Sequence, residues 1–504
     1  MARLQLTRRQ VMEALAICGA TGTVAACTPP KHPSPTTTTP TTTVVGNAGD
    51  PAAFLLASRL SFGPSPELLA LAEGGVDAYL ADQLDPAAAE APAMADLFAA
   101  IDARGEDIAS TPPSDGGSKN RRRAAVETTA LRTTAGAAWS SRQLHALLVD
   151  FWSDHLHVSI GQQPELFFVP YYDAEVIRPH AMGSFTDMLL ASARHAAMLT
   201  YLDQASSRAD RDNVPNENYA RELMELHTVG VDGGYDETDV LKAAHVLSGF
   251  SLVRKSREYT YRQAWHDLGP AATGDVLGYR PSGAGERDGE DFLAHLAHLP
   301  ATANHVCHRL AVRLVGDSVS PTDPVVADAA AAFTADDTSI ASAVRSIVDS
   351  PAFADSTPIP RRPIDLVAAM LRMGSTPVTE SQLDDLLNPL GRTVRVLGQS
   401  PWAWPAPNGY PLPGRAWISP GAMVGRWNAA LTAGAGFQTL DPLPGTSTED
   451  GADRTSVATA LLGRAPSPEL ATALGNDLGA QPGSQAESIG VRTLVFASPD
   501  FQER

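Results

Sequence analysis

The chain has 504 residues, of which 43% are hydrophobic, and its formal charge at pH 7 is −19. This length and apolar content are sufficient for a large buried core or for two fused lobes. A surface this acidic repels nucleic acid and anionic lipid headgroups, which argues against nucleic-acid binding and against electrostatic attachment to a membrane.

The N-terminal segment 1–26 has the pattern of an export signal. Arg8 and Arg9 form a twin-arginine pair, an apolar run follows, and the letters VAAC end at Cys27 in the pattern of a lipoprotein cleavage site. The apolar run is too short and too rich in Gly and Thr for a spanning helix. We expect export, cleavage before Cys27 and a diacylglyceryl group on its thiol. Two acyl chains would then anchor the protein to the outer face of the cell membrane.

Residues 27–50 are dense in Pro and Thr and poor in hydrophobic residues. Such a segment cannot bury enough apolar surface to fold, so we expect an extended tether. Cys18 would leave with the signal and Cys27 would carry lipid, which leaves Cys307 as the one remaining cysteine. An internal disulfide is therefore excluded, and stability must come from packing.

Helical periodicity and Ala-rich runs dominate residues 51–504, which predicts an all-α fold: one large multi-helical domain or two helical lobes, with a lobe break near 317–360. A small hairpin is expected within 255–285, because REYTYRQAWHD alternates and Gly-rich turns follow. Residues 105–121 are expected to form an exposed loop. The predicted helices are 51–61, 65–73, 75–83, 92–103, 122–138, 140–156, 173–179, 183–193, 195–203, 216–229, 237–249, 289–298, 300–315, 324–334, 338–348, 363–373, 379–387, 419–434, 454–463, 467–475 and 484–497.

Residues 213–249 form the stretch with the densest concentration of polar groups. Pro215 suits a first helical turn and Gly230 a helix end, so the first helix should run over 216–229. Asp236 is placed to cap a second helix. At about 100° per residue, one face of the first helix carries Glu217, Asn218, Arg221, Glu222 and Glu225, and the other carries Tyr219, Ala220, Leu223, Leu226 and His227.

The polar face of this helix has two interpretations. The i,i+4 spacing lets Arg221 pair with Glu217 and Glu225, and a solvated, salt-bridged surface would explain the pattern. The density of proton-transfer groups also makes this face a candidate catalytic site. Its residues would be Glu217, Arg221, Glu222 and Glu225, joined by His155 from a neighbouring helix.

This stretch also carries a family resemblance. The run PNENYARELMELHTVGVDGGYDETDV at 215–240 is joined by FWSDHLHV at 151–158, EVIRPHAMGSF at 175–185, AMLTYLD at 197–203 and HDLG at 266–269. Together these motifs resemble the domain-of-unknown-function 1800 family of bacterial proteins over roughly residues 52–503. The resemblance implies no established activity, so function must be argued from the residues.

Nitrogen and oxygen donors near these motifs could hold a divalent metal such as zinc, manganese or iron. The apolar stripe of the helix 140–156 directs His155 toward the core. A single core histidine bonded to a backbone carbonyl is the competing interpretation. No HExxH, paired Glu-x-x-His or CxxCH motif is present. The candidate metal ligands are His155, His157, Glu225, His227, His266 and Asp267.

The sequence therefore leaves two alternative functions, which belong to different classes. The first is an exported, lipid-anchored hydrolase of an envelope or extracellular polymer, with a carboxylate and histidine site. The second is a non-enzymatic envelope scaffold or binding protein in which the same polar groups form a buried structural network. Trp402 and Trp404, in the Pro-rich loop 399–411, could stack on a partner or pack inside.

Overall fold

The computed structural model describes residues 50–110, 119–161, 167–210, 213–253, 256–266, 274–375, 377, 379, 382–438 and 440–504. Helices dominate this part of the chain, and its only sheet has two short antiparallel strands. The all-α prediction is therefore confirmed. No helix within the described ranges is long and apolar enough to cross a membrane.

Six helices begin the folded chain, and prolines in the first turn of α2 and α3 fix their starts. The prediction of a loop over 105–121 is wrong at both ends, because α5 continues to Ser110 and α6 begins at Lys119. The residues between these two helices lie outside the described ranges. The helices are α2 (Pro51–Arg59), α3 (Pro66–Glu73), α4 (Val76–Gln83), α5 (Pro92–Ser110), α6 (Lys119–Trp139) and α7 (Gln143–His155).

Short helices and the hairpin make up the next segment. The hairpin pairs Phe250 with Tyr261, so its first strand lies upstream of the predicted range 255–285 and only the second strand falls inside it. Elements here are α8 (Val169–Tyr172), η2 (Asp173–Ile177), α9 (Arg178–His180), α10 (Phe185–Arg194), α11 (Ala196–Tyr201), η3 (Gln204–Ser206), α12 (Asn218–Glu222), η4 (Leu223–His227), α13 (Glu237–Leu247), β1 (Phe250–Leu252), β2 (Tyr259–Tyr261) and η5 (Gln263–Trp265).

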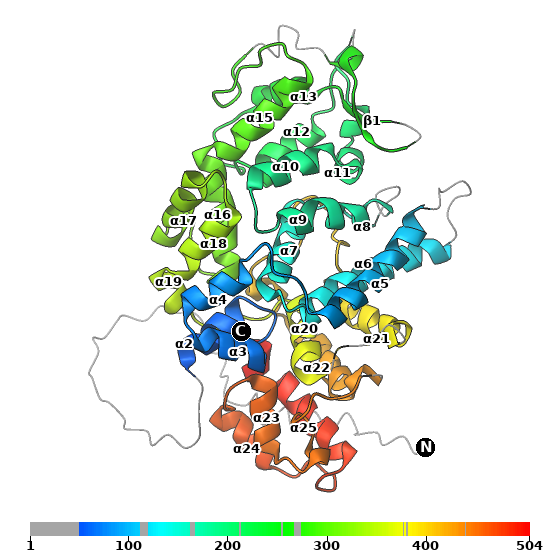
Figure 1. Cartoon of the computed structure of the whole chain (residues 1–504), viewed down its shortest axis with the longest axis vertical. Coiled ribbons are helices and arrows are strands. Elements are labelled where there is room, and N and C mark those ends of the chain that lie inside the picture. The colour runs from blue at the N-terminus through cyan, green and yellow to red at the C-terminus, as the bar shows by residue number, and fades with distance from the viewer. Residues whose placement is uncertain are drawn as a thin grey trace.

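Longer helices complete the chain. In Figure 1, α13 and β1 lie at one end of the elongated molecule and α23 to α25 at the other. The elements are α15 (Glu286–His298), α16 (Pro300–Leu314), α17 (Pro324–Ala335), α18 (Ile340–Val348), α19 (Pro351–Ala354), α20 (Pro363–Gly374), α21 (Leu383–Val396), η7 (Gly414–Trp417), α22 (Pro420–Gly434), η8 (Gly436–Gln438), η9 (Thr448–Asp450), α23 (Arg454–Leu462), α24 (Pro468–Gly475), α25 (Gln485–Ala497) and α26 (Pro499–Gln502).

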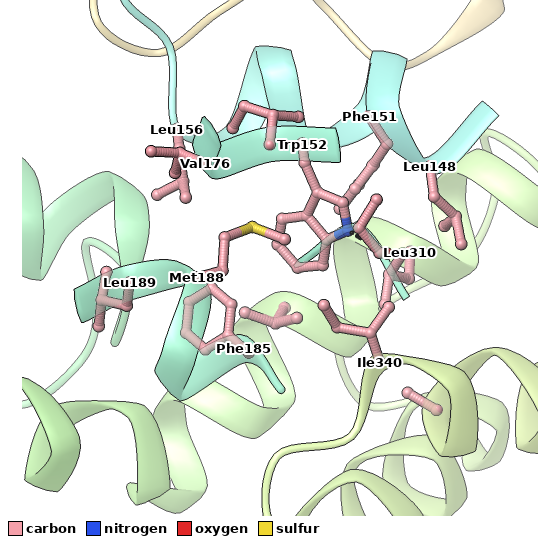
Figure 2. Close-up of a cluster of buried hydrophobic side chains, with 14 of the residues drawn as sticks. Leu148, Phe151, Trp152, Leu156, Val176, Phe185, Met188, Leu189, Leu310 and Ile340 are labelled. Atoms are coloured by element: carbon pink, nitrogen blue, oxygen red, sulfur yellow. Dashed lines mark hydrogen bonds between the residues drawn. The ribbon is translucent and has the colours of Figure 1, made fainter. Parts of the chain in front are cut away.

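Two hydrophobic cores hold these helices together. The first is built mainly from α2 to α4 and α7 to α19, and the second from α5, α6 and α20 to α26. At the centre of the first, Trp152 packs against Phe151 and Phe185 with ring centroids 4.9 and 5.5 Å away (Figure 2). Its indole N–H donates to the Ala181 carbonyl at 3.0 Å, so the only polar atom of this side chain is satisfied.

A buried ionic network joins the two cores. Arg313 of α16 donates two hydrogen bonds, of 2.8 and 2.9 Å, to Asp365 of α20. Arg362, just before α20, donates to Asp150 of α7 at 2.8 Å and also to Asp154. All five side chains are buried. Because buried ions need close partners, this network fixes α7, α16 and α20 relative to one another. We define these five residues as the inter-core ion network.

Candidate functional site

The central helix departs from the predicted single α-helix over 216–229. It begins as α12 and changes at Leu223 into the π-helical turn η4. Such turns arise where one extra residue is inserted, and they are frequent at functional sites. Gly230 ends the segment with a φ of +84°, and a Cβ there would meet the Nδ1 atom of His305 at 2.9 Å. Asp236 caps α13 together with Asp239, as the sequence predicted.

The acidic face of this helix is partly exposed to solvent. Arg221 bonds Glu217 at 3.1 Å, as expected, but its other partner is Glu237 of α13, at 2.7 and 2.8 Å, instead of the predicted Glu225. Partial burial and the neighbouring Glu225 raise the pKa of Glu222. The four predicted catalytic residues of the helix therefore form a surface cluster. Glu225 lies inside the π-helical turn, where the residue spacing differs from that of an α-helix. It is therefore not aligned with Arg221 as the i,i+4 spacing of an α-helix predicts.

Replacing Glu225 with Gln is expected to change the free energy of unfolding by less than about 1 kcal/mol, because exposed charges contribute little. Glu225 is only partly buried, and its replacement leaves the pairs of Arg221 with Glu217 and Glu237 intact. Urea unfolding of the variant and the natural chain measures the difference. A loss of several kcal/mol would mean that the cluster is closed to water.

A second group of polar side chains lies on the buried side of the same helix. The Nε2 atom of His155 is 3.0 Å from the carbonyl of His227, and the rings of His155 and His305 are 5.9 Å apart. The Nε2 atom of His305 is 3.2 Å from the Leu226 carbonyl. We call His155, His227 and His305 the histidine cluster. The expected burial of His155 and His227 is confirmed, with exposed fractions of 2% and 1%.

The histidine cluster is held in its neutral form. Burial, with the nearby Arg309 guanidinium as the next cause, lowers the pKa of His227 to about 3 and that of His305 to about 4. The same two causes lower the pKa of His155 well below its usual value. Among the described residues, the Nδ1 atom of His155 and the Nε2 atom of His227 have no hydrogen-bond partner. The cluster therefore contains neutral imidazoles without a carboxylate.

The predicted metal ligands are dispersed. His157 contacts the Ser153 and Trp404 carbonyls, at 3.3 and 2.9 Å, and the Nδ1 atom of His266 contacts Ser248. Asp267 lies outside the described residues. Within the described ranges, no group of three or more His, Cys, Asp or Glu side chains is arranged to hold a metal ion. His155 and His227 are brought together, whereas Glu225 lies in the surface cluster.

The backbone of the Pro-rich loop 399–411 forms hydrogen bonds with α7 and with the residues that follow it. Its Trp402 carbonyl accepts from the N–H of Ile160 at 2.7 Å, and Asp154 accepts from the N–H of Tyr410 at 3.1 Å. Trp402 is only 4% exposed, so it packs inside instead of facing a partner. The loop therefore covers the end of α7.

A cavity lined by many titratable groups lies elsewhere, between α5, α6, α7 and the η2–α9 turn. Its volume is about 550 Å³. Its apolar lining comes from both cores: Phe62 and Met182 belong to the first core, and Phe98 and Ile364 belong to the second. We call it the α6–α7 cleft. The titratable side chains that line it are Asp85, Glu90, Arg132, Arg142, His145, Asp150, Asp173 and Arg178.

His145 is the only histidine among the residues that line this cleft. Its Nε2 atom is 2.9 Å from the Arg178 carbonyl, and burial lowers the pKa of the ring despite that hydrogen bond. A neutral ring that donates from Nε2 keeps a lone pair on Nδ1. Arg178 in turn pairs with Asp173, and Arg132 pairs with Asp102 at 3.0 Å. The cleft therefore combines a neutral imidazole with carboxylates and guanidinium groups.

Sequence reasoning missed this cleft. Its charged residues come from five separate segments, and no short motif connects them. His145 lies one residue after the buried Leu144 on a helix whose apolar stripe the sequence showed correctly. The available signal was that this histidine and Asp150 both fall off the stripe. Sequence periodicity alone does not show which helices face those two positions.

Comparison with known proteins supports the resemblance noted from the motifs. No curated protein and no solved structure matches the chain. The model of the family described as "Protein of unknown function (DUF1800)" matches residues 55–503, which is nearly the whole described domain. The chain therefore belongs to the DUF1800 family.

Proposed function

We propose that this protein is exported and anchored by lipid at Cys27, and that it binds and hydrolyses a segment of an envelope or extracellular polymer in the α6–α7 cleft. The observation that carries the proposal is a neutral imidazole, His145, in a cleft of about 550 Å³ that also contains carboxylates and arginines. A large concave site with convergent polar groups and a perturbed pKa is the usual setting of an active site.

The proposed chemistry follows from these groups. The Nδ1 lone pair of His145 would accept a proton from a water molecule as the water oxygen attacks the linkage to be cleaved. The protonated ring would then return that proton to the leaving group as the linkage breaks. Arg132 and Arg178, which line the same cleft, would stabilise negative charge that develops on the substrate. The apolar wall residues Phe98 and Met182 would contact its less polar parts.

Export and anchoring are proposed from the signal pattern alone. Changing Cys27 to Ser removes the thiol that would carry the lipid. The variant should then appear in the soluble fraction or as an uncleaved precursor. Intact-mass analysis that finds an unmodified Cys27 in the natural protein would rule out the anchor.

The second candidate function is a non-enzymatic scaffold, and a specific observation favours it. His155, His157 and His305 each direct a ring nitrogen to a backbone carbonyl, at 2.9 to 3.3 Å. This is how histidines serve in a structural network. These three histidines therefore support the scaffold, whereas the α6–α7 cleft supports the enzyme.

The hydrolase proposal is tested with the full chain in detergent, incubated with isolated cell-envelope polymer. Mass spectrometry of the supernatant measures the fragments released. Changing His145 to Gln should lower the release rate by about 100-fold or more, as expected for loss of a general base. The matched control is His298→Gln, because His298 is a partly exposed histidine paired with Asp337. If both variants release fragments at the same rate, or if the natural chain releases none from any envelope polymer, the scaffold function explains the structure better than the hydrolase function.

A further inference from the structure

The segment 386–440 differs in charge from the rest of the chain. The whole chain has 57 Asp and Glu residues, but this segment contains none and includes four arginines. One of the four is buried, and three are exposed: Arg392, Arg395 and Arg415. The nearest acidic residue along α21, Asp385, lies about two turns before Arg392. An acidic protein therefore has a locally cationic surface here.

The same segment exposes apolar side chains. Among the residues that the structure describes, six large hydrophobic side chains are exposed, and Val396, Ile418 and Val424 are three of them. At about 100° per residue, Val396 lies opposite the stripe that α21 buries, and Val424 lies opposite the stripe that α22 buries. The stripes are Leu383, Leu386, Leu390 and Val394 of α21, and Arg426, Ala429, Ala430 and Ala433 of α22. The packing of these helices therefore requires no apolar residue at Val396 or Val424.

The exposed arginines and apolar side chains share one surface, where the end of α21 meets η7 and α22 (Figure 1). A Cβ atom added to Gly425 of α22 would lie 4.0 Å from the Cγ1 atom of Val396. One added to Gly398 would lie 4.0 Å from the ring of Trp417 in η7. The exposed side chains lie within about one helical turn of these contacts. We call this surface the α21–α22 patch, and its members are Arg392, Arg395, Val396, Arg415, Ile418 and Val424.

Few carboxylates neutralise the arginines of the α21–α22 patch. Within the described ranges, neither Arg392 nor Arg395 pairs with a carboxylate. The carboxylate next to Arg415 is that of Asp317, whose two oxygens accept from the backbone N–H groups of Gly414 and Arg415 at 2.8 and 2.7 Å. The guanidinium group of Arg415 donates to the backbone carbonyl of Asp317 at 3.0 Å. In this part of the chain the patch therefore carries a net positive charge.

We propose that the α21–α22 patch contacts an anionic lipid bilayer, with its arginines among the headgroups and Val396, Ile418 and Val424 at the boundary with the acyl chains. Guanidinium groups beside exposed apolar side chains are the usual combination at a membrane interface. Trp417, which is half-buried beside Ile418, adds the kind of aromatic ring that such interfaces favour.

The formal charge of −19 opposes this contact only at long range. At physiological ionic strength the Debye length is about 8 Å, so exposed charges farther away are largely screened. The charges that meet the headgroups are then those of the patch. The expectation from overall charge, that the protein avoids electrostatic attachment to a membrane, therefore does not hold for this face.

The inference rests on the proposed lipid anchor at Cys27, because the anchor holds the domain near a membrane. The expected tether 27–50 could extend to about 80 Å, which lets this face turn toward the bilayer. Tethering also raises the effective concentration of the patch at the membrane to about the mM range. Even a weak contact would then set the orientation of the domain.

A second copy of the chain is the competing occupant of the patch. Pairing through the same patch would bring the arginines of one copy against those of the other, and like charges oppose such a contact. The charge of the patch therefore favours an anionic bilayer over a symmetric dimer.

The test uses the full chain with Cys27→Ser, so that no lipid anchor contributes. Sedimentation compares vesicles of phosphatidylglycerol and phosphatidylcholine in equal amounts with vesicles of phosphatidylcholine alone. Binding to the anionic vesicles should be tighter by about tenfold or more, and high salt should weaken it. Adding Arg392→Gln together with Arg395→Gln should weaken that binding by about tenfold or more. Val396→Ser together with Val424→Ser should also weaken it.

The matched controls are Arg345→Gln and Val231→Ser in the same Cys27→Ser chain. Arg345 is an arginine paired with Asp77, and Val231 is 69% exposed, compared with 63% for Val396. Neither control belongs to the patch, so vesicle binding should be unchanged. All variants share the same N-terminus, so any binding by residues 1–26 cancels in the comparison. If the double arginine variant does not fold, the valine variant and the salt dependence still decide the outcome.

Equal binding to neutral and anionic vesicles, binding that high salt leaves unchanged, or patch variants that bind like the controls would overturn the proposal. A dimer in solution that the patch variants separate would overturn it in favour of a second copy. Soluble polyglutamate that binds as tightly as the anionic vesicles would overturn it in favour of an acidic polymer. Because neither a lipid anchor nor hydrolysis enters this assay, its failure is distinguishable from failure of the proposed function.

Discussion

Replacing Arg313 with Met is expected to lower the free energy of unfolding by about 3 to 5 kcal/mol, because it leaves buried carboxylates without a partner. Arg313 is 2% exposed and makes two hydrogen bonds to Asp365, which is fully buried. It also approaches Asp150 at 3.4 Å. The loss should appear in urea unfolding monitored by circular dichroism.

The matched control for this change is Arg345→Met, because Arg345 pairs with the exposed Asp77 on the surface. Its effect should stay below about 1 kcal/mol. Equal losses for the two variants would show that the inter-core ion network does not stabilise the fold.

The same network has a predicted pH dependence. Burial alone would raise the pKa of Asp365, but Arg313, Arg504 and Arg362 together hold it well below its usual range. A carboxylate whose folded pKa lies below its unfolded value stabilises the fold at pH values above about 4. This contribution is lost as the pH falls below that value. In Arg313→Met the loss should be smaller, because the main cause of the lowered pKa is gone.

Acidification from pH 6.5 toward 4 is expected to destabilise the protein steeply through the histidine cluster. An unfolded histidine has a pKa of about 6.5. In the fold, the pKa is about 3 for His227 and about 4 for His305, and that of His155 is also lowered. As the pH falls through this window, the unfolded chain binds protons that the folded chain excludes, so stability is lost. Each of the three histidines contributes up to about 1.4 kcal/mol per pH unit.

The readout is the slope of unfolding free energy against pH between 6 and 5, where most carboxylates stay ionised. Replacing His227 with Gln should reduce that slope by about 1.4 kcal/mol per pH unit, even if the variant is less stable at every pH. Identical slopes for the natural chain and the variant would mean that His227 is protonated inside the fold.

Much of the fold could be predicted from periodicity and from helix ends. Pro66 after the capping Ser65, and Asp236 with Asp239, are local signals, and the helices that they begin were placed within one or two residues. The extension of α5 to Ser110 and the π-helical turn η4 were not predictable in this way. The sequence predicts a loop over 105–121, but local residue preferences are only a weak guide to where a helix ends.

The candidate site was less predictable than the fold. The burial of His155 follows from its place on the apolar stripe of α7, but its contact with the His227 carbonyl depends on how two distant helices cross. The π turn after Glu222 separates Glu225 from the row that its spacing predicted. The α6–α7 cleft forms between segments remote in sequence, so only their packing reveals it.

The central claim is that function resides in the α6–α7 cleft and not in the surface cluster of the central helix. Hydrogen exchange of the full chain, with and without soluble fragments of the envelope polymer, tests it most directly. Residues 84–91 and 178–184 border the cleft, and their amides should exchange more slowly when the fragments are present. Slower exchange confined to residues 213–236, around the central helix, with no change at the cleft, would contradict the claim.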